Sequence, residues 1–218
     1  MEEGEGIKVI LLGEVGVGKT NLINVLFGMD FKENVASTSG ADCFEGELKY
    51  QEKSYKYFLW DTAGQEIYRA INKIFIRDAK IAIIVYAIDN QHSFEEVDFW
   101  INYVKENKGE DKYLIALVAN KSDLYEKQMV MDEEGQEAAK KHNIDFLTTS
   151  AKTDAESFRE FVNNLIIKYI NLTEGKETNN DAKKDSIKIN NGDKNDGQNK
   201  KKCCWKFFIS LSIYKNLI

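Results

Sequence analysis

The chain has no proline, only three cysteines, and no apolar run approaching the ~20 residues that a membrane-spanning helix needs. The missing proline by itself decides nothing. The cysteines, two of them adjacent at Cys203 and Cys204, give no framework for a disulfide-stapled secreted domain. The acidic segment Met1–Gly6 lacks a signal-peptide profile, and Glu2 stands where myristoylation needs glycine. We therefore expect a cytoplasmic protein with a short N-terminal extension over residues 1–6.

Charge is distributed unevenly along the sequence. The formal net charge is −6, and residues 171–218 hold ten Lys against six Asp or Glu, which gives that segment +4. Subtracting this +4 from −6 leaves −10 for residues 1–170. An acidic body of this kind argues against nucleic acid as a partner. The hydrophobic fraction of 43% suffices for a core, and the length suits one α/β domain with an appended segment.

Strand-like and helix-like runs alternate up to about residue 170, and no internal repeat is visible. This alternation predicts βαβ units and a mostly parallel sheet. Six strands are expected at residues 7–12, 44–50, 54–60, 81–86, 114–119 and 144–147. Amphipathic helices are expected from about residue 20, from Ser93 with Glu96 as a capping box, from a cap at Asp132, and from Thr153 with Glu156 as a second capping box. Their apolar faces are typical of core.

One stretch, Gly13–Thr20, fits the pattern G-x-x-x-x-G-K-[ST] of a phosphate-binding loop. It lies between an expected strand and an expected helix, which is the setting that the motif requires. Its glycines allow a tight turn that aims backbone N–H groups inward beside a helix N-terminus, making a cradle for anions. Lys19 is placed to reach β- and γ-phosphates, and the Thr20 hydroxyl to bind Mg²⁺. A chance match is the alternative, at roughly one in a hundred for this length.

Three further polar motifs follow expected strands. Asp61–Gln65 offers a carboxylate for Mg²⁺ through water, the Gly64 N–H for a γ-phosphate, and Gln65 to orient an attacking water. Asn120–Asp123 lies at the strand ends where open α/β sheets bind ligands, and an Asp there can accept the paired N–H groups of guanine while the Lys stem covers the base. Ser150–Lys152 offers backbone N–H groups to a base carbonyl. Each motif alone also fits an ordinary polar turn.

The order of these motifs, with Thr38 between the first two, resembles that of the Ras superfamily of small GTPases. Trp60 directly before Asp61–Glu66, and the cysteine pair near the C-terminus, look like the Rab family. The resemblance covers residues 7–170 and implies a P-loop NTPase G domain, an α/β fold with helices on both faces of its sheet. It also implies a GTPase that binds GTP or GDP with Mg²⁺ and whose switch segments relax when the γ-phosphate is removed.

Site residues carry over from this resemblance position by position. It implies Gln65 as the catalytic residue, and Thr20, Thr38 and Asp61 around Mg²⁺. The nucleotide-binding set that it implies is Gly13, Val15, Gly16, Val17, Gly18, Lys19, Thr20, Asn21, Phe31, Thr38, Gly64, Asn120, Lys121, Asp123, Ser150, Ala151 and Lys152. Effectors would contact Ser39–Phe44, Trp60 and Phe75. An exchange factor and a GTPase-activating protein would act on a monomer.

Several positions depart from the family pattern. Val15 adds bulk beside the expected γ-phosphate, where it can obstruct water or an incoming arginine. Cys43 makes smaller the aromatic trio that it would form with Trp60 and Phe75, and Ser39 and Ala41 also differ from the usual Rab residues there. Val35 stands where an aromatic residue often covers the nucleotide, and Ala87 where an Asp commonly follows the fourth strand. These changes suggest a divergent member that is either a working GTPase or a non-hydrolysing nucleotide-dependent clamp; a P-loop kinase or ATPase is a third alternative.

The C-terminal region divides into two parts. Residues 171–202 are polar and are expected to form a flexible tail. Lys200–Cys204 resembles the doubly geranylgeranylated end of a Rab, which cycles onto the cytosolic face of an intracellular membrane. Residues 205–218 are apolar with two interspersed lysines. They represent a chain extended past its natural stop, an interfacial anchor with palmitoylated cysteines, or a tail that packs on its own domain.

Overall fold

The computed structural model describes residues 6–38, 41–62 and 69–175, and within these ranges six strands form one sheet in the order β2-β3-β1-β4-β5-β6. β2 runs antiparallel to β3, and the other neighbouring pairs are parallel. The prediction of a mostly parallel six-stranded sheet is therefore confirmed. The strands are β1 (Ile7–Leu12), β2 (Ala41–Tyr50), β3 (Lys53–Thr62), β4 (Ile81–Ala87), β5 (Leu114–Asn120) and β6 (Asp145–Thr148).

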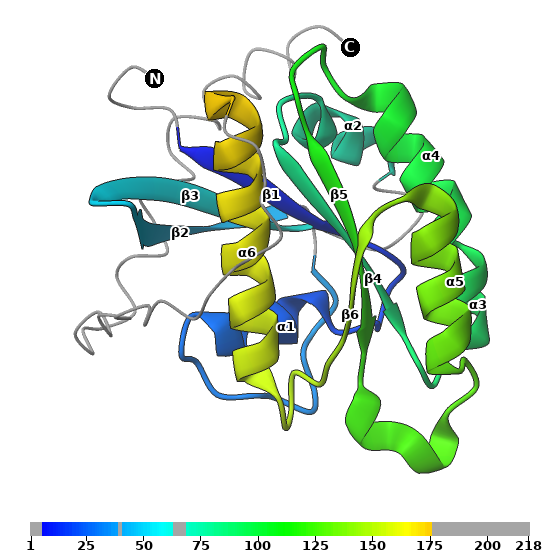
Figure 1. Ribbon diagram of the computed structural model, residues 1–218. Coiled ribbons are helices and arrows are strands. Elements are labelled where there is room, and N and C mark those ends of the chain that lie inside the picture. Colours follow the sequence, from blue (N-terminus) through cyan, green and yellow to red (C-terminus); the bar gives the residue numbers. More distant parts are fainter. Residues whose placement is uncertain (1–5, 39–40, 63–68, 176–218) are drawn as a thin grey trace, which may run out of the picture.

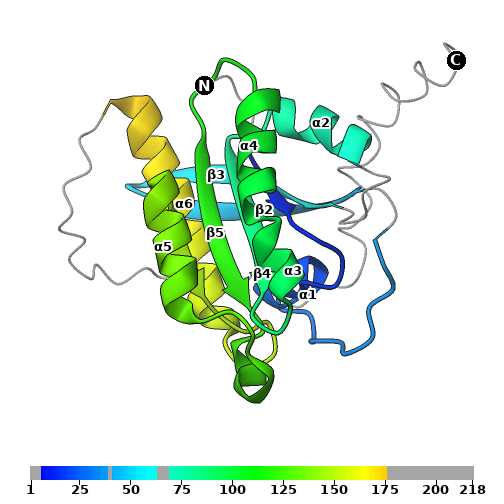
Figure 2. The same ribbon diagram turned by 90° about the vertical axis from the view of Figure 1, so that its right-hand side faces the viewer.

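Helices cover both faces of this sheet (Figure 1). These are α1 (Lys19–Leu26), α2 (Arg69–Arg77), α3 (Gln91–Glu95), α4 (Val97–Asn107), α5 (Asp132–His142) and α6 (Ala155–Glu174). A short 3₁₀ helix, η2 (Ser122–Lys127), follows β5. Figure 2 shows α6 and α4 on opposite sides of the strands. Helix α1 packs beside α6, whereas α2 and α4 contact each other on the other face.

The core consists of two layers because the central strands bury both of their faces. All six residues of β1 are buried, as expected for a strand with helices above and below it. Val9 and Leu11 belong to the layer under α1 and α6, while Ile10 and Leu12 belong to the layer under α4. This alternation follows from the two-residue period of a strand.

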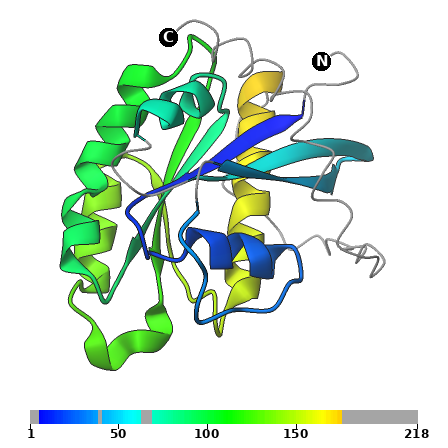
Figure 3. The ribbon, with the colours of Figure 1, turned by 180° about the vertical axis from the view of Figure 1, so that it is seen from behind.

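The carboxyl ends of the parallel strands meet at one edge of the sheet, which Figure 3 shows from behind together with α1. Pairing at this edge joins Leu11 to Asp61, and Ala87 to Asn120. The loop from β1 to α1, the end of β3 and the segments after β5 and β6 therefore lie at the same edge. Open α/β sheets bind ligands at such an edge.

The start predicted for the helix after β4 is wrong by about one turn. The cap of α3 is Asn90, whose side chain accepts a hydrogen bond from the Ser93 N–H at 3.1 Å. Ser93 lies inside α3, where its buried hydroxyl donates to the Asn90 carbonyl at 2.7 Å. Asn caps a helix as well as Ser does, so the sequence contained two competing start signals. The helical segment is also interrupted at Glu96, which separates α3 from α4.

Two more predicted caps are displaced by one residue. Asp154, not Thr153, caps α6 and accepts from the Ser157 N–H at 3.3 Å. Asp132 lies in the first turn of α5 rather than at its cap, and its carboxylate accepts a hydrogen bond from the Thr148 hydroxyl at 3.1 Å. Each Asp therefore stabilises a helix start, but from a position that sequence spacing alone does not separate from its neighbour.

The final helix continues four residues beyond the predicted end at residue 170. Asn171 accepts a hydrogen bond from the Tyr50 hydroxyl at 3.3 Å, and Glu174 accepts one from the Tyr55 hydroxyl at 3.1 Å. The helix ends at Gly175, which has a left-handed conformation. Contacts to the β2–β3 hairpin thus extend the folded domain into the predicted tail.

Parts of the predicted organisation lie outside the described residues: positions 1–5, the remainder of the tail over 176–202, and the segment 203–218 with Cys203 and Cys204. Across the ranges that the structure does describe, there is no helix with both the length and the apolarity needed to cross a membrane.

Candidate functional site

The loop between β1 and α1 requires glycine at two crowded positions. Gly13 has φ +135°, and a Cβ atom there would lie 2.1 Å from the Val85 carbonyl oxygen. Gly18 has φ +95°, and a Cβ atom there would lie 2.4 Å from the Asn120 side-chain nitrogen. Gly18 also precedes α1 without a side-chain cap, so backbone N–H groups at the helix start are available to an anion. The predicted phosphate cradle therefore has the required backbone geometry.

Lys19 is held inside this loop. Its side chain is buried, and the ammonium group donates to the carbonyl oxygens of Gly13 at 2.8 Å and Glu14 at 2.9 Å. Burial lowers the pKa of Lys19 to about 8, and the negative charges of Asp61 and Glu14 act against this shift. The arrangement holds a cation where a phosphate chain would lie along the loop.

Two threonine hydroxyls converge on one buried carboxylate. The Asp61 Oδ2 atom accepts from Thr20 Oγ1 at 2.7 Å and from Thr38 Oγ1 at 3.2 Å, and the two hydroxyl oxygens lie 3.1 Å apart. Burial raises the pKa of Asp61, while these hydrogen bonds and the Lys19 charge lower it. Among the described residues, Asp61 Oδ1 is buried without a hydrogen-bond partner. The three predicted Mg²⁺ residues are thus brought together from α1, β3 and the segment between α1 and β2.

This set fits Mg²⁺ in its chemistry. All three groups offer oxygen, the ligand type that Mg²⁺ prefers, and Mg²⁺ commonly takes one or two protein groups together with waters and substrate phosphates. Within the described ranges, no group of three or more His, Cys, Asp or Glu side chains is placed to hold a metal by itself. The orphaned Oδ1 atom of Asp61 is an acceptor that a water of the ion's hydration shell would satisfy.

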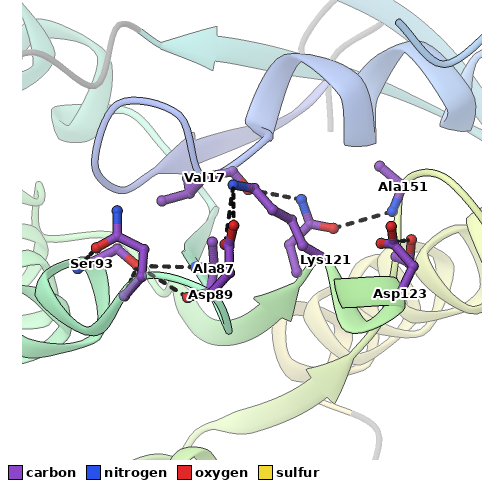
Figure 4. Close-up of polar contacts among 10 residues, drawn as sticks. Val17, Ala87, Asp89, Ser93, Lys121, Asp123 and Ala151 are labelled. Carbon is purple, nitrogen blue, oxygen red and sulfur yellow. Dashed lines mark hydrogen bonds and ion pairs between the residues drawn. The ribbon is translucent and has the colours of Figure 1, made fainter. Parts of the chain in front are cut away.

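Asn120, at the end of β5, bridges the phosphate loop and the loop after β6 by bonding to Val17 and Ala151, which Figure 4 labels. It is buried, its Nδ2 donates to the Val17 carbonyl at 2.8 Å, and its Oδ1 accepts from the Ala151 N–H at 3.1 Å. Val17 is itself fully buried, and it contributes this carbonyl rather than its side chain. Asn120 therefore fixes the phosphate loop relative to the loops after β5 and β6.

Asp123 and Ser150 form the next layer of the pocket. Ser150 Oγ donates to Asp123 Oδ1 at 2.6 Å and accepts from the N–H groups of Lys152 at 3.0 Å and Thr153 at 3.2 Å. Ser150 is fully buried, so its predicted role in binding becomes one of orienting the carboxylate. An oriented carboxylate can accept two N–H groups from one edge of a base.

These residues surround one cleft of about 380 Å³, a size suited to a small ligand. Gly13, Val17, Asp61 and Ser150, which were also predicted, are not among its lining residues. The predicted residues lining it are Val15, Gly16, Gly18, Lys19, Thr20, Asn21, Phe31, Thr38, Asn120, Lys121, Asp123, Ala151 and Lys152. The lining also includes Glu33, Val35, Ala36, Ser37, Thr62 and Leu124, most of which come from an irregular segment without a motif. The predicted Gly64 and Gln65 lie outside the described residues.

The segment after α1 is attached to the cleft at two points. The Asn21 side chain donates to the Lys32 carbonyl at 2.8 Å and accepts from the Lys32 N–H at 3.2 Å. The Lys152 ammonium lies 3.3 Å from a Glu33 carboxylate oxygen and 5.9 Å from the centre of the Phe31 ring. Asn21, which was predicted to bind nucleotide, lines the cleft, and its side chain also holds the segment that carries Phe31.

Three of the predicted effector residues form a cluster that lies mostly beneath the surface, whereas Asp42 is exposed and Phe44 packs against the layer under α1 and α6. Cys43, Trp60 and Phe75 are 5–7% exposed, and the rings of Trp60 and Phe75 lie 5.0 Å apart. The Lys8 ammonium lies 5.4 Å from the Trp60 ring centre and 5.6 Å from that of Phe75, and burial lowers its pKa to about 8. Ser39, at the start of the predicted effector segment, lies outside the described residues.

Sequence reasoning missed two contacts around the site. The Trp100 indole N–H donates to the Glu14 carboxylate at 3.1 Å, which links α4 to the phosphate loop. Asp89, just beyond β4, pairs with Lys121. The sequence could have indicated Asp89, because polar residues just past the strands of such a sheet lie at the edge where ligands bind. Nothing in the sequence distinguished Trp100, because an aromatic residue on the apolar face of a helix is predicted to lie in the core.

A loop with the phosphate-binding pattern, a set of oxygen ligands suited to Mg²⁺ and a cleft on the carboxyl edge of a mostly parallel sheet are the features of a P-loop G domain. The family model of the Ras family matches residues 8–170. The chain therefore belongs to the Ras family and is a small GTPase of the Ras superfamily. The match spans the sheet and most of α6, so it includes every described part of the candidate site.

Proposed function

We propose that this protein is a Rab-like GTPase that hydrolyses GTP to GDP and phosphate and thereby regulates intracellular vesicle traffic. Membership of the Ras family supports guanine nucleotide as the ligand. The observation that carries the proposal is the base pocket: Asn120 ties its loops together, and Ser150 holds Asp123 ready for a base edge. Guanine presents a ring N–H and an exocyclic amine on one edge, and a carboxylate accepts both.

In this proposal the chain positions the substrate and stabilises its charge. Lys19 and the loop N–H groups hold the β- and γ-phosphates, and Thr20, Thr38 and Asp61 hold Mg²⁺. The bound ion would neutralise charge that develops on the phosphate oxygens. Gln65 orients the attacking water, and the Gly64 N–H binds the γ-phosphate. Loss of that phosphate removes the partner of Thr38 and Gly64, so both switch segments relax and effectors dissociate.

The Rab-like part of the proposal rests on sequence features. Trp60 precedes Asp61–Glu66, and Cys203 and Cys204 follow three lysines. Two lipids beside a basic patch would give stable anchoring to the cytosolic face of an intracellular membrane. An exchange factor would load GTP, and a GTPase-activating protein would accelerate its cleavage. Effectors would read the surface around residues 39–44 with Trp60 and Phe75.

Nucleotide competition and single-turnover cleavage test the enzymatic part. The purified chain with Mg²⁺ should bind fluorescent GDP that excess GTP displaces and excess ATP does not. Preloaded GTP should be cleaved in a single turnover, and Gln65→Leu should slow cleavage strongly while leaving GDP binding intact. Displacement by ATP would contradict the assignment of guanine.

The intact mass of the native protein from a membrane fraction tests the Rab-like part. Two prenyl groups on a chain ending at Cys204 would support the proposed cycle. A mass that includes residues 205–218 without prenyl groups would contradict it and would make that apolar segment the candidate anchor.

A non-hydrolysing nucleotide clamp is the second candidate, and one observation favours it. Val15 lines the cleft with its side chain 46% exposed, beside the position expected for the γ-phosphate. Bulk there can exclude the attacking water. In that case bound GTP would remain uncleaved in the single-turnover assay, although guanine selectivity would persist.

A further inference from the structure

A carboxylate beyond β4 is paired with the lysine of the predicted base pocket. The Lys121 ammonium lies 3.2 Å from Asp89 Oδ1 and donates a hydrogen bond to Asp89 Oδ2 at 3.4 Å (Figure 4). The two side chains are only 29% and 21% exposed, so water screens this pair less than a surface ion pair. The interaction joins the ends of two neighbouring parallel strands.

Backbone contacts fix where Asp89 lies. The Ile88 N–H donates to the Asn120 carbonyl at 3.1 Å, which places the residue after Ile88 beside the residue after Asn120. The Asn90 N–H closes the turn onto the Ala87 carbonyl at 3.0 Å. The buried Ser93 hydroxyl accepts from the Ala87 N–H at 3.1 Å and donates to the Asn90 carbonyl. Asp89 therefore lies in a turn that hydrogen bonds hold to the end of β5 on one side and to α3 on the other.

The backbone of Lys121 adopts an uncommon conformation at the end of β5. It is left-handed, with φ 66° and ψ 34°, a region that residues other than glycine seldom adopt. Lys121 lines the cleft together with Asp123, whereas Asp89 does not line it. The carboxylate thus holds the end of the lysine from outside the cleft, while the lysine itself forms part of the cleft wall.

We propose that Asp89 is a positioning residue for base binding: it anchors the Lys121 ammonium so that the aliphatic stem lies along the plane of the bound base. The inference rests on the proposed binding of a guanine nucleotide. A long flexible side chain loses rotamer freedom when it packs on a ligand. The ion pair with Asp89 fixes the stem beforehand, so this loss is not incurred on binding.

Because the stem contacts the face of the base and not its edge, the effect of Asp89 does not depend on the exocyclic amine. Asp123 should read that amine, and Lys121 should not. Loss of Asp89 therefore weakens GDP and inosine diphosphate, which lacks the amine, by the same factor. This equality separates an action through Lys121 from an indirect disturbance of Asp123.

The test measures dissociation of GDP and of inosine diphosphate from the Mg²⁺-loaded full chain. Asp89→Ala should accelerate both about tenfold, and Asp89→Asn about threefold, because an amide oxygen still accepts a weaker, uncharged hydrogen bond. Asp98→Asn is the matched control, since Asp98 forms an ion pair with Lys141 at 2.6 Å outside the cleft. The control should lower thermal stability without changing either dissociation rate.

A double-mutant cycle completes the test. Lys121→Met keeps an unbranched stem but removes the ammonium, so Asp89→Ala should have no further accelerating effect in that background. Additive effects of the two changes, unchanged or slower dissociation in Asp89→Ala, or unequal factors for the two nucleotides would each overturn the inference. Failure of the unsubstituted chain to bind GDP would instead overturn the proposed function.

Discussion

The buried lysine of the phosphate loop predicts that nucleotide affinity falls in mildly alkaline solution. Lys19 has a pKa of about 8 because burial disfavours its charge, compared with 10.5 for an exposed lysine. A bound phosphate chain favours the ammonium form and raises this pKa, so above pH 8 binding requires uptake of a proton. At pH 9 about one tenth of the unbound protein still carries the charge. GDP affinity should therefore fall about tenfold between pH 7 and pH 9.

The same shift gives the free protein the opposite dependence. The unfolded chain binds more protons than the folded chain between pH 8 and pH 10.5, so the contribution of Lys19 to stability rises with pH in that window. Below pH 8 the lysine is charged in both states, and the full penalty for burying it remains. Lys8 should contribute to the unfolding free energy in the same direction, so the fall in GDP affinity is the signature of Lys19.

Equilibrium titration of fluorescent GDP at constant ionic strength, below the pH at which guanine loses its ring proton, measures this effect. Lys8→Met is the control, because Lys8 also has a pKa of about 8 but lies by Trp60 and Phe75, away from the cleft. That variant should keep the pH profile. An affinity that stays constant from pH 7 to pH 9, or a fall that Lys8→Met abolishes, would refute the assignment to Lys19.

Three substitutions give further predictions. Val15→Gly removes bulk from the cleft and should speed single-turnover GTP cleavage; an unchanged rate would exclude Val15 as an obstruction. Tyr86→Phe removes a hydroxyl that is buried without a hydrogen-bond partner among the described residues. Denaturant unfolding should therefore show an unchanged free energy of unfolding or a gain of about 1 kcal/mol. A clear loss of stability would reveal a hidden partner of the hydroxyl. Gly135→Ala should lower the free energy of unfolding by about 1–3 kcal/mol, because a Cβ atom there would contact Tyr86 Oη and would lie 2.7 Å from the Phe146 ring. Combining it with Tyr86→Phe should recover part of that loss.

The mostly parallel six-stranded sheet could be predicted because the apolar character of its strands and their alternation with helices are local properties of the sequence. β4 is a continuous apolar run, and β1 is one apart from Lys8, as a parallel strand covered on both faces requires. Helix starts were harder to predict, since two residues within one turn of each other often have equal capping ability. Asn90 and Ser93 are both good caps, and the choice between them depends on the bonds that Ser93 makes to the turn before α3.

The end of α6 shows a different limit of sequence reasoning. Residues 171–174 look like the start of a polar tail, yet Asn171 and Glu174 bond to tyrosines more than a hundred positions earlier in the chain. No local pattern contains that information. The motif residues of the site were predictable because they combine a fixed spacing with a known chemistry, whereas the irregular lining segment of Glu33–Ser37 has neither.

The acid partner of Lys121 shows why a position-by-position comparison can mislead at this edge of the sheet. Ala87, in register with Asn120 at the end of β4, lacks the carboxylate that often stands there. Asp89 supplies a carboxylate two residues later, because the turn closed by Asn90 directs the chain toward the end of β5. The carboxylate that pairs with Lys121 therefore comes from the turn after β4 and not from the last residue of the strand. A strand-end motif is better defined by the side chains that its turn brings together than by the residue that occupies one position.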